Sequence, residues 1–319
     1  MQDDTVTKFA DTLALLRANA EAEIARIGGF SKGEVGVAAC HLGTALELAV
    51  ADTFRYPPAS TVKLPLALTV LDRVDRGLLR LDDMIEVQQE EMNPAGPIGD
   101  EFLHPGVALS VLNLLEPMIT RSCNTATDVL FRVVGGPGIV ADYLRRVGID
   151  DFEVRRTMRE ALCVLHELPL PPPGVSMRDV LRTQPFEVID ARNRENADFH
   201  HDRRDHATPR AMLGLLRRLW QGELVSAPSR DLLLDIMSRT STSIDRAQAR
   251  LPRGVAFASK GGSGAGTAVD VGYLTLPDGR GTVALAIFVK ASPLGMDARN
   301  AVIADIARMV YDYFVITAG

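Results

Sequence analysis

The sequence predicts an α+β fold built on one five-stranded antiparallel sheet. Two short strand-like runs lie near the N-terminus and three near the C-terminus, and a long helical stretch separates them. Helical segments also occupy both ends of the chain. Because each element must bury its apolar face, the simplest assembly puts the terminal helices on one face of the sheet and the inserted all-helical lobe on the other. The sheet lobe would comprise residues 1–55 and 250–319, and the helical lobe residues 56–249.

The first predicted elements are a helix and a hairpin. Residues 4–27 have apolar side chains at helical spacing, among them Leu13 and Leu16, and Gly28 and Gly29 end the segment. The runs GEVGVAAC and ALELAVADT follow, with only four residues between them. This spacing predicts two hairpin strands.

The middle of the chain predicts helices and the last third predicts strands. Pro- and Gly-rich loops separate the expected helices, which are 60–79, 108–119, 123–134, 137–147, 209–221 and 226–238. The segments GVAFASK, TAVDVGYLTL and GTVALAIFVK then alternate or run apolar, as strands of an antiparallel sheet do. A Pro-Asp-Gly turn precedes the last strand, and a helix over 295–315 follows it.

The composition excludes several classes of function. The 319 residues carry a formal net charge of −6, whereas nucleic-acid and anionic-membrane surfaces need basic patches. No apolar run approaches the roughly 18–20 residues that span a bilayer. The three cysteines include no CxxC pair, so neither a disulfide framework nor a zinc site is expected. We therefore expect a monomer that acts on a small molecule, without cofactor, metal, nucleic-acid or membrane partner.

The N-terminus does not have the pattern of a secretory signal. The segment MQDDTVTKFADTLALL has two acids near its start and no basic stretch followed by an apolar core. We expect a cytoplasmic protein, or a secreted one if the numbering starts after a removed signal.

Ser60 and Lys63 stand one turn apart where an apolar helix begins, in RYPPASTVKLPLAL. Ser is a favoured N-cap, and Lys on a first turn is usually solvated, so the pair could be purely structural. The alternative is a serine nucleophile with its proton acceptor. An S-x-x-K spacing occurs by chance in most proteins of this size, so the pair alone does not decide.

Two further motifs favour the catalytic interpretation. The tripeptide SCN occupies residues 122–124, and KGG occupies residues 260–262, where it leaves an apolar strand. With these motifs the chain resembles the class A β-lactamases, which belong to the penicillin-recognising serine enzymes with the signatures S-x-x-K, S-D-N and K-T-G. Counterparts to family segments, including HATPRAMLGLLRRLW, follow in order from about residue 34 to 317, with the main gap at 151–205.

The resemblance implies a role for each matching residue. Ser60 would be the acylated nucleophile at a helix start, where the N–H groups and the helix dipole favour an oxyanion. Lys63 would be desolvated, which lowers its pKa and lets it accept the Ser60 proton. Ser122 would pass a proton to the leaving group. Four residues would bind the substrate, its oxyanion or these side chains: Asn124, Lys260, Gly261 and Ser263.

Two departures from the family pattern lie within the motifs. Cys123 stands where the family has an acid, and a thiol cannot replace the hydrogen bonds of a carboxylate. We expect a rearranged loop around a buried, inert thiol. Gly261 replaces the Thr of K-T-G, which removes a charge-assisted hydrogen bond to substrate worth roughly 1.5–3 kcal/mol. The site would then prefer another substrate shape, or Ser263 would supply the hydroxyl.

The third departure is the loop at 151–205. The family's loop carries a Glu that positions the deacylating water, followed closely by an Asn. Glu160 can be placed at that position by its spacing from Gly148, but no E-x-x-L-N pattern follows. Glu160 is therefore either the catalytic base or a solvated acid at the start of a helix.

Residues 169–205 add material that the family does not need. The segment PLPPPG predicts a stiff connector. A charged run follows that contains His200, His201, Asp202, Asp205 and His206. These residues lack the spacing of a metal-ligand set on rigid elements, so we expect a lid over the cleft.

The sequence thus predicts a serine hydrolase or acyl-transfer enzyme that forms an acyl-Ser60 intermediate from an amide, lactam or ester, a β-lactam being one candidate. Two alternatives stay open. One is an intracellular biosynthetic acyltransferase or esterase of this fold without useful β-lactamase activity. The other is a non-catalytic ligand-binding relative, although such a protein has no need of two lysines, two serines and an amide in this arrangement.

Overall fold

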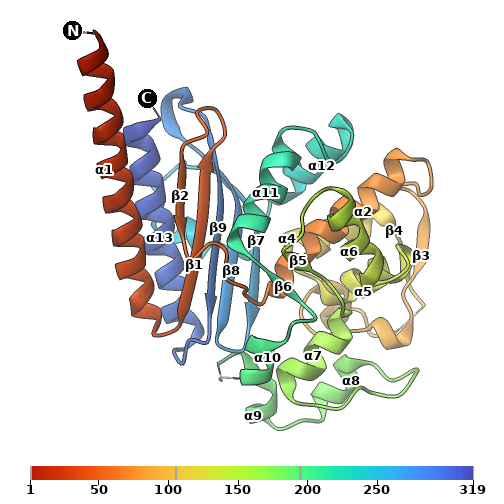
Figure 1. The fold of residues 1–319 in the computed structure, drawn as a ribbon. Coiled ribbons are helices and arrows are strands. Elements are labelled where there is room, and N and C mark those ends of the chain that lie inside the picture. Colours follow the sequence, from red (N-terminus) through yellow and green to blue (C-terminus); the bar gives the residue numbers. More distant parts are fainter. Residues whose placement is uncertain (1, 105, 194–195, 319) are drawn as a thin grey trace.

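Five strands form one antiparallel sheet at the centre of the molecule (Figure 1). The computed structural model describes residues 2–104, 106–193 and 196–318. The strand order is β2-β1-β9-β8-β7. The strands are β1 (Glu34–His41), β2 (Glu47–Val50), β7 (Phe257–Gly264), β8 (Thr267–Thr275) and β9 (Thr282–Lys290). This arrangement confirms the predicted α+β class and its five-stranded antiparallel sheet.

The two terminal helices cover one face of the sheet. Helix α1 (Gln2–Gly28) lies beside α13 (Met296–Thr317), and both pack on the strands (Figure 1). The central strand β9 explains how the sheet serves two cores. Its alternate residues face the terminal helices, namely Val283, Leu285, Ile287 and Val289. The residues between them face the helical lobe, namely Ala284, Ala286 and Phe288. Its uninterrupted apolar run is therefore a strand buried on both faces.

Helices cover the other face and form the lobe beside it. Helix α11 (Pro209–Trp220) packs on β1 and β9. The remaining helices of the lobe are α2 (Lys63–Asp75), α3 (Pro97–Glu101), α4 (Val111–Thr120), α5 (Asn124–Val133), α6 (Pro137–Arg146), α7 (Met158–His166), α8 (Met177–Arg182), α9 (Phe186–Ile189), α10 (Ala197–His201) and α12 (Ala227–Ser238). Two small strand pairs complete it: β3 (Met84–Glu86) with β4 (Ala108–Ser110), and β5 (Phe152–Glu153) with β6 (His206–Ala207).

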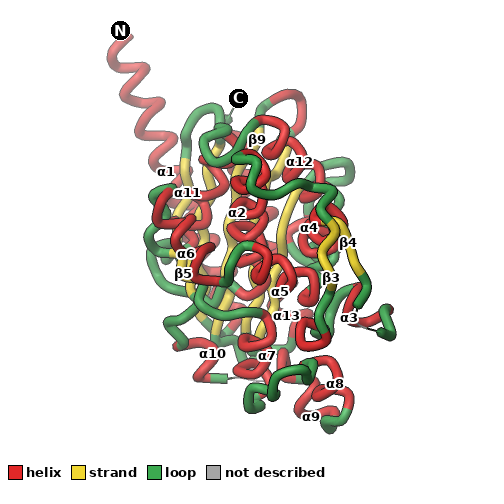
Figure 2. Tube along the Cα trace, turned by 90° about the vertical axis from the view of Figure 1, so that its right-hand side faces the viewer, coloured by secondary structure: helices red, strands yellow, loops and turns green. Residues whose placement is uncertain are grey.

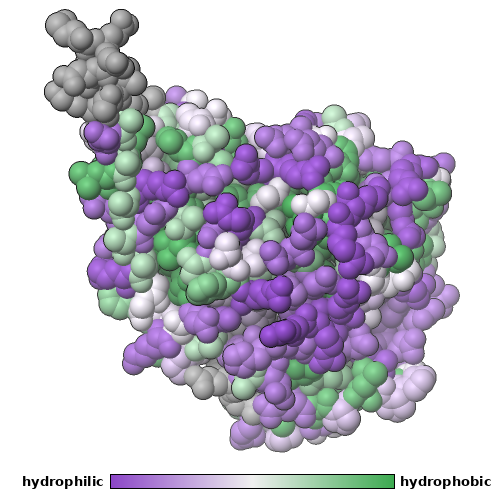
Figure 3. Space-filling model, in the orientation of Figure 1, coloured by the Kyte–Doolittle hydropathy of each residue, from purple (hydrophilic) through white to green (hydrophobic). Residues whose placement is uncertain are grey.

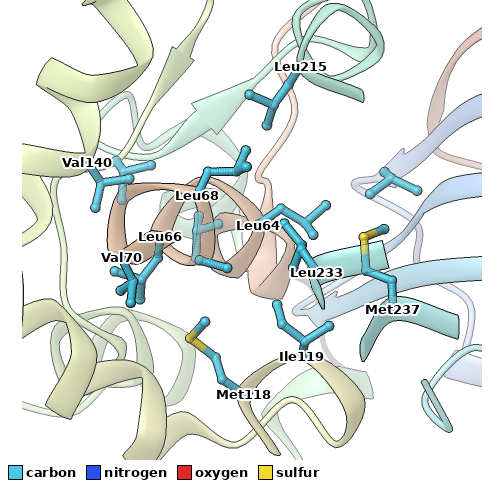
Figure 4. Close-up of a cluster of buried hydrophobic side chains, with 14 of the residues drawn as sticks. Leu64, Leu66, Leu68, Val70, Met118, Ile119, Val140, Leu215, Leu233 and Met237 are labelled. Atoms are coloured by element: carbon cyan, nitrogen blue, oxygen red, sulfur yellow. The ribbon is translucent and has the colours of Figure 1, made fainter. Parts of the chain in front are cut away.

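Helix α2 is the centre of the lobe. Every residue from Lys63 to Leu71 is buried, as expected for a helix that is apolar nearly all round. Figure 4 shows its leucines and Val70 surrounded by side chains of four other helices. These neighbours are Met118 and Ile119 of α4, Val140 of α6, Leu215 of α11, and Leu233 and Met237 of α12. This packing holds the start of α2 in a fixed position.

The region 151–205 differs from the predicted connector and charged extension. It contains the short helices α7 to α10, which group at the lower end of the molecule (Figure 2). They have a hydrophobic cluster of their own, which includes Leu162, Cys163, Leu165, Met177, Leu181 and Phe199, and Ala265 after β7 joins it. The apolar residues among the charged ones therefore build a small helical unit against the sheet. Residues 194–195 of the charged run lie outside the described residues.

A smaller difference concerns where one predicted helix begins. The predicted helix over 108–119 begins with strand β4, and Ser110 then caps α4 by accepting a hydrogen bond from the Asn113 N–H at 3.1 Å. Hydrophilic side chains cover most of the face seen in Figure 3. Among the described helices, none has the length and apolar character of a membrane span.

Candidate active site

Ser60 lies where the chain turns into the central helix of the lobe. It belongs to the short 3-10 helix η2 (Ala59–Val62), which continues directly into α2. The residue before it, Ala59, has a left-handed backbone with a φ of 45°. An Ala in this conformation is strained and persists only where the surrounding structure enforces it. The buried turns of α2 supply that enforcement, so the half-buried Ser60 hydroxyl has a defined position.

Lys63 connects two side chains predicted as catalytic, Ser60 and Ser122, with one predicted to bind substrate, Asn124. Its side chain is fully buried. The ammonium nitrogen Nζ lies 3.0 Å from Ser60 Oγ, 3.0 Å from Ser122 Oγ and 2.8 Å from Asn124 Oδ1. It also lies 2.7 Å from the backbone oxygen of Ser122. The structure thus brings the S-x-x-K and S-C-N motifs into one hydrogen-bonded group.

The surroundings of Lys63 favour its neutral form. Burial lowers the pKa of Lys63 to about 7, the positive charge of Arg192 acts in the same direction, and Cys123 and Asp128 oppose the shift. A lysine with this pKa is neutral in a large fraction of molecules near pH 7. Its free lone pair can then accept the proton of the Ser60 hydroxyl.

Ser122 lies between the two lysines. Lys260 Nζ donates to Ser122 Oγ at 3.0 Å and to the backbone oxygen of Gly261 at 2.6 Å. Burial, followed by the charges of Lys63 and Arg246, holds the pKa of Lys260 well below its usual range. Ser122 has a left-handed backbone with a φ of 55°. This unusual conformation points the hydroxyl between the two amines, so the hydroxyl can exchange protons with either.

Strand β7 approaches Ser60 closely because it carries a glycine there. A Cβ on Gly262 would lie 2.9 Å from the Ser60 backbone nitrogen and 3.0 Å from the Ala59 Cβ. Any larger residue would push the strand away from η2. The next residue, Ser263, lines the cleft on both sides of Ser60.

Arg246 explains the glycine in the third motif. A Cβ on Gly261 would lie 3.1 Å from Arg246 Nη1, so the guanidinium fills the space beside this position. The buried Arg246 donates to the backbone oxygens of Gly262 at 2.7 Å and Val269 at 3.0 Å, and to Ser263 Oγ. The third motif therefore lacks the Thr hydroxyl at position 261, and the guanidinium of Arg246 is hydrogen-bonded to the nearby Ser263 hydroxyl. Arg246 comes from the loop after α12, where no local pattern distinguishes it from a surface arginine.

Cys123 is a free, fully buried thiol. Its backbone N–H donates to Pro117 O at 3.0 Å, and its backbone oxygen accepts from Thr127 Oγ1 at 2.7 Å. The backbone of the turn is therefore held without a side-chain acid.

The structure does not bring Glu160 into the cleft. Its Oε2 accepts hydrogen bonds from Thr157 N at 2.8 Å and Thr157 Oγ1 at 3.0 Å, which caps the start of α7. Glu160 lines a separate cavity together with Glu91 and Leu170. The spacing from Gly148 suggested a position at the site, but the capping geometry turns this carboxylate toward its own helix terminus.

Apolar side chains stand beside Ser60 on the side of α7. They line a cavity with Ser60 and Asn124 at its mouth, and they are Val62, Met158, Ala161, Leu162, Leu165 and Phe199. Asp205 is the single acid among the described residues that line this cavity. Both its oxygens are engaged, since Oδ2 accepts from Arg156 Nε at 2.6 Å and Oδ1 from Arg155 N at 2.7 Å.

The His- and Asp-rich run has a structural role around the same arginine. Arg156 also donates to Asp202 Oδ2 at 2.8 Å, so two acids of the run neutralise one buried guanidinium. His200 Nε2 lies 2.6 Å from the backbone oxygen of Ala265. In the part of the chain that the structure describes, no group of three or more His, Cys, Asp or Glu side chains could hold a metal ion.

A second arginine that the sequence analysis did not identify, Arg192, enters the cleft from segment 169–205. Arg192 lines both the apolar cavity and the polar cleft that contains Ser122 and Arg246. Burial and the nearby charge of Arg246 lower the pKa of Arg192. The polar cleft is therefore rich in positive charge beside Ser60, which suits an anionic group on a ligand.

Comparison with known proteins gives a consistent result. A family model described as "Beta-lactamase enzyme family" matches residues 19–314. The β-lactamase VEB-1 of Pseudomonas aeruginosa is 25% identical over 291 residues, which cover 88% of this chain and 85% of that protein. The extended-spectrum β-lactamase PER-1 of the same organism is 29% identical over 295 residues, with 88% and 83% covered. A solved structure of an ancestral (GNCA) class A β-lactamase has a TM-score of 0.76 at 31% identity, covering 92% of this chain and 99% of that one.

Proposed function

The chain belongs to the beta-lactamase enzyme family and is a serine hydrolase of β-lactamase type, and we propose that it works through an acyl-Ser60 intermediate. The observation that carries the proposal is the position of Lys63 Nζ, 3.0 Å from both Ser60 Oγ and Ser122 Oγ, with a pKa of about 7. A nucleophile, its base and a proton relay are thereby in direct contact. The substrate is an amide, a lactam or an ester, and β-lactams are the class to test first because the relatives are β-lactamases.

Acylation of Ser60 follows from these contacts. Neutral Lys63 takes the proton of Ser60 Oγ while this oxygen forms a bond to the substrate's carbonyl carbon. The backbone N–H groups of Ser60 and Ser263 stabilise the resulting oxyanion. When the bond to the leaving nitrogen or oxygen breaks, Ser122 gives its proton to that atom. Lys63 then returns the proton it holds to Ser122 across their 3.0 Å contact.

The leaving-group side of the substrate lies in the cationic part of the cleft. Arg246 and Lys260 stand on either side of Gly261, and the Ser263 hydroxyl is bonded to the guanidinium. The N–H groups of Arg246 are all engaged within the protein, so a carboxylate or another anion on the leaving group would accept a hydrogen bond from the Ser263 hydroxyl, in the positive field of the guanidinium. Asn124 holds Lys63 through Oδ1 and stands at the boundary with the apolar cavity.

Removal of the acyl group is the slow half of the reaction in this proposal. A water on the α7 side of Ser60 would face Met158 and Leu162, and the one acid there, Asp205, is bonded to Arg156. An ordered water needs about two to four polar partners. The acyl group therefore leaves slowly to water, or passes to an amine or alcohol that enters through the polar cleft.

Intact-mass spectrometry tests the nucleophile. The protein should gain one adduct with a penicillin or with a fluorophosphonate, mapped to Ser60, and Ser60→Ala should gain none. Ser241→Ala is the matched control, because Ser241 lines the same cleft but its hydroxyl bonds to the backbone oxygen of Thr120. Full labelling of the Ser60→Ala protein would show that the nucleophile is another residue.

A further inference from the structure

The apolar cavity beside Ser60 is a site that the proposed chemistry leaves unused. It meets the polar cleft at four residues: Ser60, Asn124, Arg192 and Ser263. From this junction the polar cleft extends toward Ser122 and Arg246, and the apolar cavity extends toward α7. A substrate carbonyl bonded to Ser60 thus has two directions in which its substituents can lie, and the two have opposite polarity.

One face of α7 contributes four apolar residues to the cavity wall. Met158, Ala161, Leu162 and Leu165 follow the spacing i, i+3, i+4 and i+7, which aligns them in a single apolar stripe. The helix start is anchored to α5, because Asp128 accepts hydrogen bonds from Met158 N at 2.6 Å and Arg159 N at 2.9 Å. The stripe is therefore held rigidly toward Ser60.

A glycine at the end of β7 allows an aromatic ring to close the cavity. A Cβ on Gly264 would lie 2.4 Å from two ring carbons of Phe199, Cε1 and Cζ. The ring of Phe199 packs directly on the strand backbone and is 8% exposed. Segment 169–205 thereby contributes a wall of the site as well as its own small core.

The cavity offers few polar groups away from its junction with the polar cleft. Arg156 and Asp205 bind one another at 2.6 Å, and the other polar lining residues all stand at that junction, namely Ser60, Asn124, Arg192 and Ser263. The cavity volume is about 60 Å³. Since a cavity water needs about 10–15 Å³ by this measure, the space fits a chain of roughly four to six heavy atoms. Burial of each methylene there should favour binding about fourfold.

We propose that this cavity binds the acyl chain of the substrate, and that the enzyme selects carboxylic acid derivatives with a short apolar acyl group of about four to six carbons. The inference rests on the acyl-Ser60 intermediate proposed above. In the acyl-enzyme, the carbonyl carbon is bonded to Ser60 Oγ, the chain lies against Leu162 and Phe199, and the leaving group departs through the cationic cleft with the Ser122 proton.

A series of p-nitrophenyl esters from acetate to decanoate tests the acyl-chain preference. In each acylation Ser60 Oγ bonds to the acyl carbon, p-nitrophenolate leaves, and Lys63 takes the Ser60 proton. The rate of the p-nitrophenolate burst should rise about fourfold per methylene and reach a maximum near butanoate to hexanoate. A parent rate that does not depend on chain length, with Ser60 still acylated, would overturn the inference and leave the proposed function standing.

Variants of α7 locate the preference in the cavity. Ala161→Phe should fill it and move the maximum to acetate. Leu162→Ala should enlarge it and move the maximum to longer chains, and thermal unfolding checks that each variant is folded. The control is Ala227→Phe, because Ala227 is exposed on α12 and lines neither the cavity nor the polar cleft.

Three outcomes decide between the claims. Opposite shifts for the two cavity variants and none for Ala227→Phe support the inference. An unchanged maximum in both folded cavity variants contradicts it. Absence of any Ser60 acylation across the ester series contradicts the proposed function, and the inference fails with it.

Discussion

Lys63 and Ser122 are joined twice, since Lys63 Nζ lies 3.0 Å from the Ser122 hydroxyl oxygen and 2.7 Å from its backbone oxygen. The backbone contact fixes the amine relative to the loop, and the hydroxyl contact gives it a route to the leaving group. A left-handed residue is required to offer both oxygens to one amine, which accounts for the φ of 55° at Ser122. In the proposed mechanism, base and relay therefore act as one unit.

Lys63→Arg should remove nearly all acylation although the positive charge remains. Arginine stays protonated in proteins and cannot accept the Ser60 proton. A positioned general base contributes about 10²–10⁴ in rate, so the adduct formation rate should fall by that factor. Stopped-flow or intact-mass kinetics with a fluorophosphonate measure it. A rate within about tenfold of the parent would mean that Lys63 supplies only its electric field.

The acylation rate should depend on pH through Lys63. With a pKa of about 7, the neutral amine is the minor form below pH 7 and the major form above it. The rate should therefore rise about tenfold per pH unit below pH 7 and level off above pH 8. A pH profile of kcat/KM for an uncharged ester measures this. A rise that continues to pH 10 would show that Lys63 titrates as an ordinary lysine.

The acyl group that a penicillin places on Ser60 should be removed slowly, so that the acyl-enzyme persists for minutes. The wall beside Ser60 is apolar, and Glu160 is engaged in the cap of α7. Glu160→Gln should change the acyl-enzyme lifetime by less than about tenfold, below the ~10²–10⁴ lost with a working base. A time course of intact mass after one penicillin pulse measures both proteins. If the parent returned quickly to its unmodified mass and the Glu160→Gln protein did not, Glu160 would instead be the base of a true β-lactamase.

Gly262→Ala should lower the acylation rate by about a hundredfold. The added Cβ would lie 2.9 Å from the Ser60 backbone nitrogen, so either strand β7 or Ser60 must move. A displacement of about 1 Å at reacting groups costs about that factor. The control is Gly29→Ala, where a Cβ meets no atom within 4 Å. Equal rates for the two variants would contradict the close approach of β7 to Ser60.

Arg156→Ala should lower the free energy of unfolding by about 3–5 kcal/mol, because it leaves two acids without their buried partner. Urea unfolding measures this change. Arg145→Ala is the control, since its ion pair with Asp142 is exposed and should cost at most about 1 kcal/mol. Similar losses in both variants would mean that the buried ion pairs do not stabilise the fold beyond the exposed one.

The sequence predicted the sheet and its flanking helices because their periodicity is local. Strand β9 and helix α2 show apolar runs whose burial follows from their length and flanks. The structure also brings together Ser60, Lys63 and Ser122, which motif spacing had selected. The limits of the two lobes at residues 55 and 250, the monomeric state and the compartment stay predictions.

The parts that the sequence did not reveal depend on contacts between distant segments. Arg246 reaches the site through hydrogen bonds to strand backbone about twenty residues away, and no pattern around it distinguishes it from an exposed arginine. Glu160 was placed by spacing, but the Thr157 cap directs its side chain to the helix end. Helix α7 was not among the helices predicted from the sequence, and only its packing shows that the apolar stripe from Met158 to Leu165 faces the cavity beside Ser60.

The complete burial of α2 has a consequence for how the protein opens. Amide protons in the middle of α2 can exchange with solvent only when the whole lobe unfolds, because neighbouring helices surround that helix on every side. Helices α8 to α10 are short and share a small core with α7 and Ala265, so they should open at a lower free-energy cost than α2. If the cavity binds the acyl chain as proposed, changes in that unit should alter which acyl groups are accepted and leave the contacts of Lys63 with Ser60 and Ser122 unchanged.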